Sequence, residues 1–442
     1  MNPRIAIVYI DSGGGHRAAA NALCEVIGEQ RRPWDVRLLS IQEMLDSIDF
    51  VRKSTGIRFQ EVYNIMLRRG WTLGSAQLIP LMHLLIRMSH PAQVRVLRRH
   101  WSQFRPDLVV SLIPHYNRSL KQSLEGAWPG TPYVTILTDI ADYPPHFWIE
   151  RQDQYVICGS GRAAVQARLL GLPASRILRA SGMILHPRFY SAVNPDRAGE
   201  LARLGLHAGR PTGLVLFGGE GSLEMVRIAR ALNRARSRAQ LILLCGRHQR
   251  AAAELRAMHP RIPMFVEGFT RDIPRYMELA DFFIGKPGPG CISEALAKGL
   301  PVIVERNAWT LAHERFNADW VEEQQVGVAV GGAREIPAAV ERLLDPDRYP
   351  RFRARALATR NAAVYEIPAL LERILAAHRQ APDWSSNPDG ARGPLPCVHP
   401  SVSHNIIPSG AATQHHPATA WTSAAASPAA SCDTPGCAPA GT

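Results

Sequence analysis

The sequence lacks the cysteine patterns of disulfide frameworks and zinc sites. None of its seven cysteines forms a Cys-x-x-Cys pair or has the spacing of a metal-ligand set. The longest apolar run, residues 76–86, is too short to span a bilayer and contains Pro80 and His83. No secretory leader is visible before the first apolar stretch. We therefore expect a protein of a reducing compartment, located in the cytoplasm and peripheral on the inner face of the cell membrane.

Acidic residues are almost missing from residues 51–106, where ten Lys or Arg accompany one acid, Glu61. This basic window contributes a net +9 to a chain whose formal charge is +13. Large apolar residues, including Trp71 and Trp101, are interleaved with the arginines. A basic segment with amphipathic aromatics favours an anionic membrane surface as its partner. Nucleic acid is not expected, because no nucleic-acid module is recognisable.

The length and apolar content indicate about two compact domains. The chain has 442 residues, of which 46% are hydrophobic, and short apolar strands alternate with helical stretches in two successive cycles. This alternation predicts an α/β protein with two tandem doubly wound, Rossmann-like domains and a ligand cleft between them, at the carboxyl ends of their strands. We expect an N-terminal domain at 1–185, a second domain at 186–360, a closing helix at 361–380 and a disordered tail at 381–442, rich in Ala, Ser and Pro.

The stretch from Gly285 to Asn317 carries the most informative pattern. An apolar strand, DFFIG, leads into the turn Gly288-Pro289-Gly290 and then into a helix that contains Cys291. The free amides of a first helical turn, opened by glycines, suit a phosphate. Glu294 lies about 6 Å further along the helix by the helical rise, which suits a ribose hydroxyl pair. The pattern predicts a nucleotide diphosphate held end-on.

A second glycine turn, Gly14-Gly15-His16, follows the first apolar strand. It matches the dinucleotide fingerprint only loosely, because the second strand ends in Ser40 rather than in an acid. At the start of a helix, His16 would accept a proton near neutral pH or would serve only as a neighbour of the helix cap.

Two further strand ends belong to the predicted second domain. Gly218, Gly219 and Gly221 form a turn whose amides suit a phosphate oxygen, although such turns also occur for tight packing. Phe269 and Thr270 follow a later strand, where the ring would either stack on a flat base or lie in the core.

In the first domain, Thr138 and Asp139 end a buried strand ahead of a loop with a Pro-Pro turn. Asp139 would orient or activate an acceptor hydroxyl, or would cap a turn; its place at the strand end favours the functional role. No Asp-x-Asp metal site is formed here, and Asp345-Pro346-Asp347 falls in a turn. We therefore expect no metal.

Four segments together resemble a known family: SGGGHRAAANAL, FGGEGS, TDIADYPPHFW and GKPGPGCISEALAKGLPVIVERNAWTLAHERFNADW. They are similar to the monogalactosyldiacylglycerol synthases and diacylglycerol glucosyltransferases of glycosyltransferase family 28. More distantly, they resemble the GlcNAc transferase of peptidoglycan synthesis. The resemblance covers about residues 1–375. It implies a GT-B fold, a UDP-sugar donor, a membrane lipid acceptor, chiefly diacylglycerol, inversion at the sugar and no metal or other cofactor.

By position, the resemblance also assigns roles to individual residues. It implies donor binding by Gly218, Gly219, Gly221, Phe269, Thr270, Gly288, Pro289, Gly290, Cys291, Glu294, Glu314, Arg315 and Asn317. It places Gly14, Gly15, His146 and Trp148 on the acceptor side, and His16 or Asp139 as the catalytic base. This chain has Ala312-His313-Glu314 where plant members have Gly-Gln-Glu. UDP-galactose and UDP-glucose therefore both stay open as donors.

Other functions share the same nucleotide site. A UDP-sugar 2-epimerase-like enzyme, or a GT-B transferase with a different acceptor, would need the same turns and Glu294. An epimerase, however, has no use for the basic window. A nucleotide-sugar-binding regulator without enzymatic activity is a further alternative.

Overall fold

The computed structural model describes residues 2–11, 14–48, 75–143, 147–191, 196–308 and 310–380. His146, most of the basic window before residue 75 and the predicted tail at 381–442 lie outside the described residues.

The first sheet is built of six parallel strands in the order β2-β1-β3-β4-β5-β6. Its core strands β3 and β4 are buried along their whole length, as expected of a parallel sheet with helices on both faces. The strand order reverses between β1 and β3, and ligands bind at such reversals in open α/β sheets. The strands are β1 (Arg4–Tyr9), β2 (Asp35–Ser40), β3 (Leu108–Ser111), β4 (Tyr133–Ile136), β5 (Tyr155–Cys158) and β6 (Ile177–Arg179).

Helices connect these strands as the alternation of strand and helix patterns predicts. The α-helices are α1 (Gly15–Glu29), α2 (Ile41–Leu45), α5 (Ser75–Gln103), α6 (Asn117–Ala127) and α7 (Gly161–Leu169). Short 3₁₀ turns are η1 (Asp46–Ile48), η2 (Ala174–Arg176) and η3 (Pro187–Phe189).

The second sheet also has six parallel strands, in the order β12-β11-β10-β7-β8-β9. Its order reverses between the neighbouring strands β7 and β10. The strands are β7 (Thr212–Leu216), β8 (Gln240–Leu244), β9 (Met264–Glu267), β10 (Phe282–Gly285), β11 (Val302–Glu305) and β12 (Gly327–Val330). The helices are α8 (Arg197–Arg203), α9 (Glu224–Arg234), α10 (Gln249–Arg256), α11 (Ile273–Leu279), α12 (Pro289–Ala297), α13 (Ala312–Glu323), α14 (Ile336–Leu343) and α15 (Tyr349–Ala358).

Aromatic side chains of β10 fill the core on both faces of the second sheet. Phe282 and Phe283 are fully buried and belong to separate hydrophobic clusters, because successive side chains of a strand point to opposite faces. A Cβ at Gly213 of β7 would lie 2.6 Å from the Phe282 ring. Gly213 therefore gives the Phe282 ring its space and keeps β10 in place beside β7.

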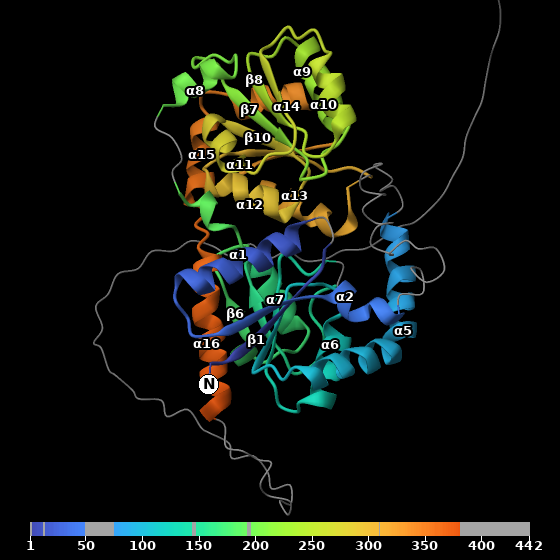
Figure 1. Ribbon diagram of the computed structural model, residues 1–442. Helices are drawn as coiled ribbons and strands as arrows, with labels where there is room; N and C mark the ends of the chain where they lie inside the picture. Colours follow the sequence, from blue (N-terminus) through green and yellow to red (C-terminus); the bar gives the residue numbers. More distant parts are fainter. Residues whose placement is uncertain are drawn as a thin grey trace, which may run out of the picture. The chain divides into compact units, whose positions relative to one another are not determined.

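The last described helix, α16 (Ala363–Gln380), packs against α1 and the first sheet (Figure 1). Ile367 and Leu371 are buried in the core of that sheet, and burial of each such side chain contributes about 1.5 to 3 kcal/mol. Arg32 forms an ion pair of 2.6 Å with Glu372 at the edge of this contact. Helix α16 therefore packs with the N-terminal half of the chain.

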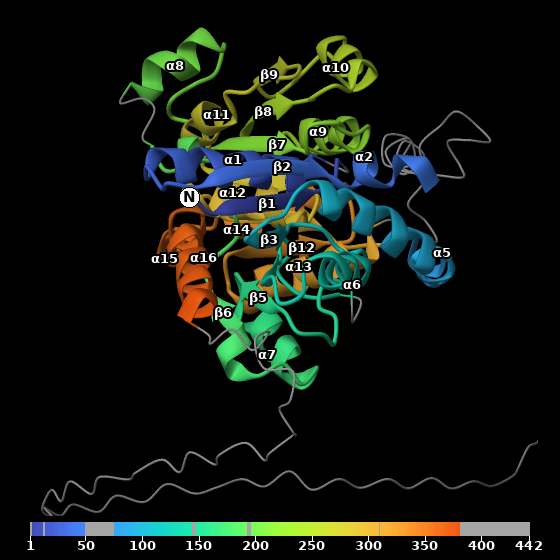
Figure 2. The same cartoon turned by 60° about the horizontal axis from the view of Figure 1, so that its bottom comes forward.

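Helix α5 is the described part of the basic window, and it packs against α6 (Figure 2). Trp101 is fully buried and its indole N–H donates to Ser123 Oγ at 2.9 Å. Trp101 is therefore a core residue, and its interpretation as one of the membrane-facing aromatics is wrong. None of the helices in the described residues combines the length and hydropathy that crossing a membrane requires.

Candidate functional site

Two predicted donor turns converge where the strand order of the second sheet reverses. Strand β7 leads into Gly218, and the neighbouring strand β10 leads into Lys286 and Gly288. The backbone of Gly218 hydrogen-bonds the thiol of Cys291, and a Cβ at Gly288 would lie 3.3 Å from Lys286 Cε. Burial raises the pKa of Cys291 to about 12, so this thiol is neutral. The structure thus brings both turns together around Lys286.

The turn that contains Gly218 owes its shape to its glycines. Gly218 and Gly221 have φ angles of 73° and 69°, in the left-handed region that favours glycine. A Cβ at Gly221 would lie 2.1 Å from the carbonyl oxygen of Cys245, at the end of β8. A side chain at Gly221 would therefore displace the turn from the sheet, whereas Gly219 is exposed and a Cβ there would have Arg247 Nη1 at 3.9 Å.

Helix α12 presents unpaired amides at its first turn. Pro289 occupies the first helical position and has no N–H, and the amide of Ile292 donates to Gly288 O at 3.1 Å. The amides of Gly290 and Cys291 are the donors that such a turn leaves without an intrahelical partner. A Cβ on Gly290 would meet nothing within 4 Å. Free donors, open space and the positive end of the helix dipole suit an anion here.

Glu294 lies one turn further along α12 and is half-buried. Burial raises its pKa to about 7, and the nearby charge of Arg188 opposes this shift only in part. Within the part of the chain that the structure describes, its carboxylate has no hydrogen-bond or ion-pair partner. Such a carboxylate, close to free amides, has its acceptor capacity available for hydroxyl groups.

Residues of α13 contact Lys286, Pro287 and the loop that precedes α13. Glu314 accepts from Lys286 Nζ at 2.8 Å; although burial alone raises its pKa, Lys286 and His313 outweigh this and the pKa lies below the usual value. Asn317 is buried and donates to Pro287 O at 2.8 Å. Arg315 donates to the carbonyls of Thr310 and Ala308 at 3.2 and 3.3 Å. Arg315 and Asn317 therefore hold loop backbone, and sugar contact by them stays a prediction.

Phe269 is 52% exposed, so the alternative of a core residue is wrong. The guanidinium of Arg247 lies 4.4 Å from the centre of its ring and forms an ion pair of 3.3 Å with Glu220. A cavity of about 420 Å³ is lined by Arg247 and Phe269. Thr270 Oγ1 accepts from the amide of Asp272 at 3.0 Å. The exposed ring beside a cavity can stack on a flat base.

The side chains at the carboxyl end of the first sheet form two hydrogen-bonded groups that a ring contact joins. His16 Nδ1 lies 3.0 Å from Thr138 Oγ1, and the rings of His16 and Trp148 are 5.7 Å apart. The indole N–H of Trp148 donates to Asp139 Oδ2 at 2.8 Å. Trp148 is itself held by Asp142, whose carboxylate accepts from its backbone amide at 2.7 Å. The structure therefore brings His16, Asp139 and Trp148 together.

Burial shifts the titration of both candidate bases in this cluster. It lowers the pKa of His16 to about 4, with a further lowering by His313, while the Leu112 backbone opposes the shift. Burial also raises the pKa of Asp139, against the effects of His313 and the Trp148 hydrogen bond. At neutral pH the His16 imidazole is thus uncharged, and burial makes it a weaker base than an exposed histidine.

Gly14 and Gly15 leave the space beside His16 open. Gly14 caps α1 with φ at 81°, where glycine is strongly favoured, and its carbonyl accepts from the Ala18 amide at 3.1 Å. A Cβ on either glycine would meet nothing within 4 Å. The structure keeps this turn accessible, as an acceptor-side role requires, while His146 lies outside the described residues.

Contacts between rings join the two groups of residues. The rings of Phe147 and His313 stack at 5.5 Å and 17°, and Arg162 lies 5.5 Å from the ring of Phe316.

Sequence reasoning missed Lys286, His313 and Phe147 as members of the site. The position of Lys286 between a strand end and a glycine turn was a usable signal, and His313 stands beside the predicted Glu314. Among the described residues, no group of three His, Cys, Asp or Glu side chains is arranged to hold a metal.

Comparison with known proteins identifies the second half of the chain. Residues 214–364, which include β7 to β12, match the family model of the glycosyltransferase family 28 C-terminal domain. Residues 214–364 are thus similar to the C-terminal domain of family 28 glycosyltransferases. The predicted donor residues from Gly218 to Asn317 all lie within this domain.

Full-length comparison extends the similarity to the first half. The chain is 28% identical over 363 residues to the chloroplast monogalactosyldiacylglycerol synthase of Spinacia oleracea, covering 78% of this chain and 66% of the relative. It is 27% identical to monogalactosyldiacylglycerol synthase 1 of Arabidopsis thaliana, covering 76% of this chain and 64% of the relative. The chain thus spans just under two thirds of these relatives. The resemblance seen in the motifs is confirmed.

Solved structures confirm the predicted GT-B fold. The MurG structure from Acinetobacter baumannii matches with a TM-score of 0.55 at 13% identity, covering 84% of this chain and all of that chain. The UDP-GlcNAc 2-epimerase of Neisseria meningitidis, bound to UDP-GlcNAc, matches with a TM-score of 0.52 at 14% identity, with the same coverage. At these identities the similarity establishes the architecture but does not identify the reaction.

Proposed function

We propose that the protein is an inverting glycosyltransferase that moves a hexose, galactose or glucose, from a UDP-sugar to a hydroxyl of a membrane lipid, diacylglycerol in the first instance. One observation carries the proposal. The cluster of His16, Asp139 and Trp148 is joined through the Phe147–His313 stack to helix α13 of a family 28 domain, where Glu314 pairs with Lys286 beside the donor turns. A proton acceptor and a nucleotide-diphosphate site in one protein suit group transfer from a nucleotide sugar.

In this proposal the donor is held by α12 and its neighbours. The amides of Gly290 and Cys291 bind the diphosphate, Glu294 accepts from the ribose hydroxyls and Phe269 stacks on uracil. The helix dipole and the ammonium of Lys286 stabilise the negative charge that develops on the departing UDP. These groups supply the stabilisation for which other enzymes use a metal.

The chemical step is a single displacement at the anomeric carbon. When His16 Nδ1 carries its proton and donates to Thr138, Nε2 is left to accept the proton of the lipid hydroxyl. The oxygen of that hydroxyl forms its bond to the anomeric carbon while the bond to the UDP oxygen breaks. Attack from the side opposite UDP inverts the configuration. The carboxylate of Asp139, fixed by the Trp148 indole, stabilises the imidazolium that results.

Helix α5 supports docking on a lipid surface. Leu84 and Met88 are 53% and 72% exposed, and Arg87 between them is also exposed. Residues at these spacings share one helix face. Apolar side chains flanked by arginine suit the boundary between acyl chains and anionic headgroups. The acceptor would thereby reach the site from the membrane.

The assay that tests the proposal follows UDP release with UDP-galactose or UDP-glucose in the presence of vesicles that contain diacylglycerol. We expect release that depends on the vesicles, and a lipid product heavier by one hexose. If neither donor gives a glycolipid, the diacylglycerol assignment is wrong. Turnover of a UDP-sugar without any lipid favours an epimerase-like reaction, and UDP binding without turnover favours a regulator.

A further inference from the structure

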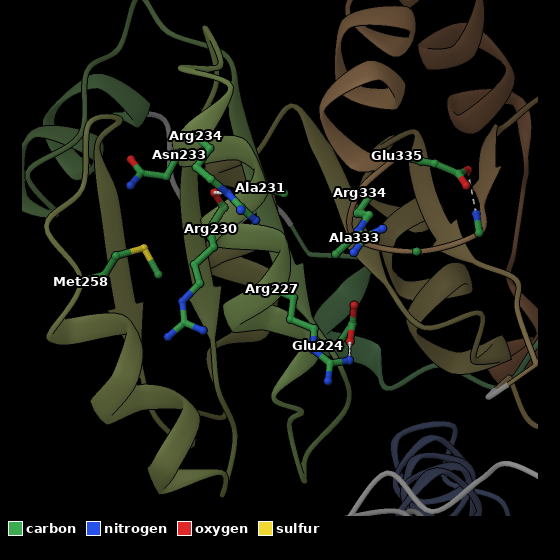
Figure 3. Close-up of a pocket in the computed structure, with 12 residues that line it drawn as sticks. Glu224, Arg227, Arg230, Ala231, Asn233, Arg234, Met258, Ala333, Arg334 and Glu335 are labelled. Atoms are coloured by element: carbon green, nitrogen blue, oxygen red, sulfur yellow. Dashed lines mark hydrogen bonds and ion pairs between the residues drawn. The ribbon is translucent and has the colours of Figure 1, made fainter. Parts of the chain in front are cut away.

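A groove on the second sheet's helical layer lies outside the site described above. It has a volume of about 770 Å³ and runs between α9 and the loop that leads into α14. Its charged lining consists of Arg227, Arg230, Arg234, Arg334, Glu224 and Glu335. Figure 3 shows the first three arginines leaving α9, with Arg334 on the other side of the groove. The proposed transfer reaction assigns no role to any of them.

The three arginines of α9 form a continuous basic stripe. Arg227, Arg230 and Arg234 are spaced by three and four residues, so they project from one face of the helix. The stripe extends over about 10 Å along the helix axis by the helical rise. Placing three guanidinium groups on one face is destabilising unless counter-charges balance them.

Acidic residues, one of the groove and one of α10, pair with only part of this stripe. Glu224 pairs with Arg227 at 2.8 Å, and Glu254 pairs with Arg230 at 3.2 Å. The carboxylate of Glu335 accepts from the backbone amide of Gly331 at 2.9 Å and faces no guanidinium in the described residues. Arg227 and Arg230 are thus paired with carboxylates of the protein.

Two exposed guanidinium groups that line the groove have no acidic partner in the described ranges. Arg234 has only a weak contact of 3.4 Å from its Nε to the carbonyl of Arg230, and Arg334 makes no hydrogen bond or ion pair. They come from different elements, α9 and the loop before α14, and line the same groove (Figure 3). Guanidinium groups present paired donors that match the oxygens of a phosphate.

We propose that this groove is a second anion site, which binds a phosphate-bearing ligand of at least two negative charges through Arg234 and Arg334. The volume exceeds that of a single phosphate and suits an organic phosphate or the phosphate headgroup of a lipid. The groove differs from the diphosphate site at Gly290 and Cys291 in the residues that form it. Arg234 lies at the C-terminal end of α9, about 15 Å along the axis from Glu224 at its start.

The test is a calorimetric titration of the full chain with inorganic pyrophosphate in the presence of saturating UDP, which occupies the donor site. We expect a UDP-insensitive binding step that the double variant Arg234→Ala/Arg334→Ala weakens about tenfold or more. The matched control is Arg351→Ala/Arg355→Ala, which removes two exposed arginines from α15 of the same domain and the same net charge. Loss of pyrophosphate binding on addition of UDP, or equal weakening in both double variants, would overturn the proposal.

A second arm identifies where the phosphate comes from. Vesicles of phosphatidylcholine with and without phosphatidic acid are sedimented with wild type, the groove variant and the α15 control. Selective loss of phosphatidic acid binding in the groove variant assigns a lipid headgroup. Unchanged vesicle binding with weakened pyrophosphate binding assigns a soluble phosphate. Arg334→Lys separates geometry from charge, because lysine keeps the charge and loses the paired donors; we expect a smaller loss than for Arg334→Ala.

Discussion

The carboxyl ends of the two sheets are built from different kinds of groups. At the first sheet, side chains hydrogen-bond one another. His16 pairs with Thr138, and Trp148 donates to Asp139 while its ring lies beside that of His16. At the second sheet, the groups are backbone amides at the start of helix α12 and the carboxylate of Glu294, which has no partner among the described residues. The first end is a preorganised side-chain cluster, and the second is a set of unfilled donors and acceptors.

This difference separates two tasks. A ligand gains most from groups that have no partner before it binds, because no internal hydrogen bond is broken. A proton acceptor instead needs a fixed orientation and tautomer, which neighbouring hydrogen bonds provide. We therefore expect substitutions at the first sheet to change kcat, and substitutions at the second sheet to change donor affinity.

The largest effect is expected from His16→Ala. Removing a general base lowers kcat by about 10²- to 10⁴-fold, while UDP affinity stays at the wild-type value. Initial rates over a range of donor concentration measure both quantities. His90→Ala, on α5, is the matched control, because the one side-chain partner of His90 in the described part of the chain is the exposed Gln122, at 2.7 Å. A normal kcat for His16→Ala would remove His16 as the base.

Glu294→Ala is the corresponding change at the second sheet. Loss of charged hydrogen bonds to the ribose weakens UDP binding by about 1.5 to 3 kcal/mol, measured by calorimetry. The control is Glu323→Ala, an exposed acid at the end of α13. Unchanged UDP affinity in the Glu294 variant would contradict its ribose role.

The pH dependence of UDP affinity sharpens the same comparison. With a pKa of about 7 in the free protein, Glu294 gains a proton as pH falls from 8 to 6. A protonated carboxyl is a weaker acceptor, so wild-type affinity falls over this window. Glu294→Gln cannot titrate, so its UDP affinity should fall less than that of the wild type over this window, because the ionisation of UDP contributes equally to both proteins. Parallel pH profiles would show that Glu294 does not bind the ribose as a carboxylate.

Sequence spacing predicted the turns of the second end, although it missed Lys286 and His313, and it did not predict the contacts between side chains at the first end. Glycine turns and helix starts leave local signatures, so Gly218, Gly288 and Glu294 could be placed from spacing alone. The partners of His16 could not, because Thr138 and Trp148 are 122 and 132 residues away in the sequence and meet it only in the folded sheet. The buried state of Trp101 was missed for the same reason, since its partner Ser123 lies on another helix.

A smaller effect is expected from Phe269→Leu, which tests whether the second end binds the base as well as the phosphates. Leucine keeps apolar area and loses the ring face, so UDP binding should weaken by about 1 kcal/mol or more. Pyrophosphate competes for the same amides and lacks a base, so its affinity for the donor site should not change. Equal losses for UDP and pyrophosphate would show that the substitution disturbs the fold of the turn instead.

The smallest effect tests the orientation of the base at the first end. Thr138→Val keeps the shape and removes the hydroxyl 3.0 Å from His16 Nδ1. A single neutral hydrogen bond is worth about 1 kcal/mol, so kcat should fall about fivefold while UDP affinity stays constant. Thr138→Ser restores the hydroxyl and should recover most of the rate. The contact with His16 Nδ1 requires only a hydroxyl. A loss that serine does not rescue would therefore mean that the Thr138 methyl group is needed for packing after β4, and it would contradict an oriented His16 tautomer.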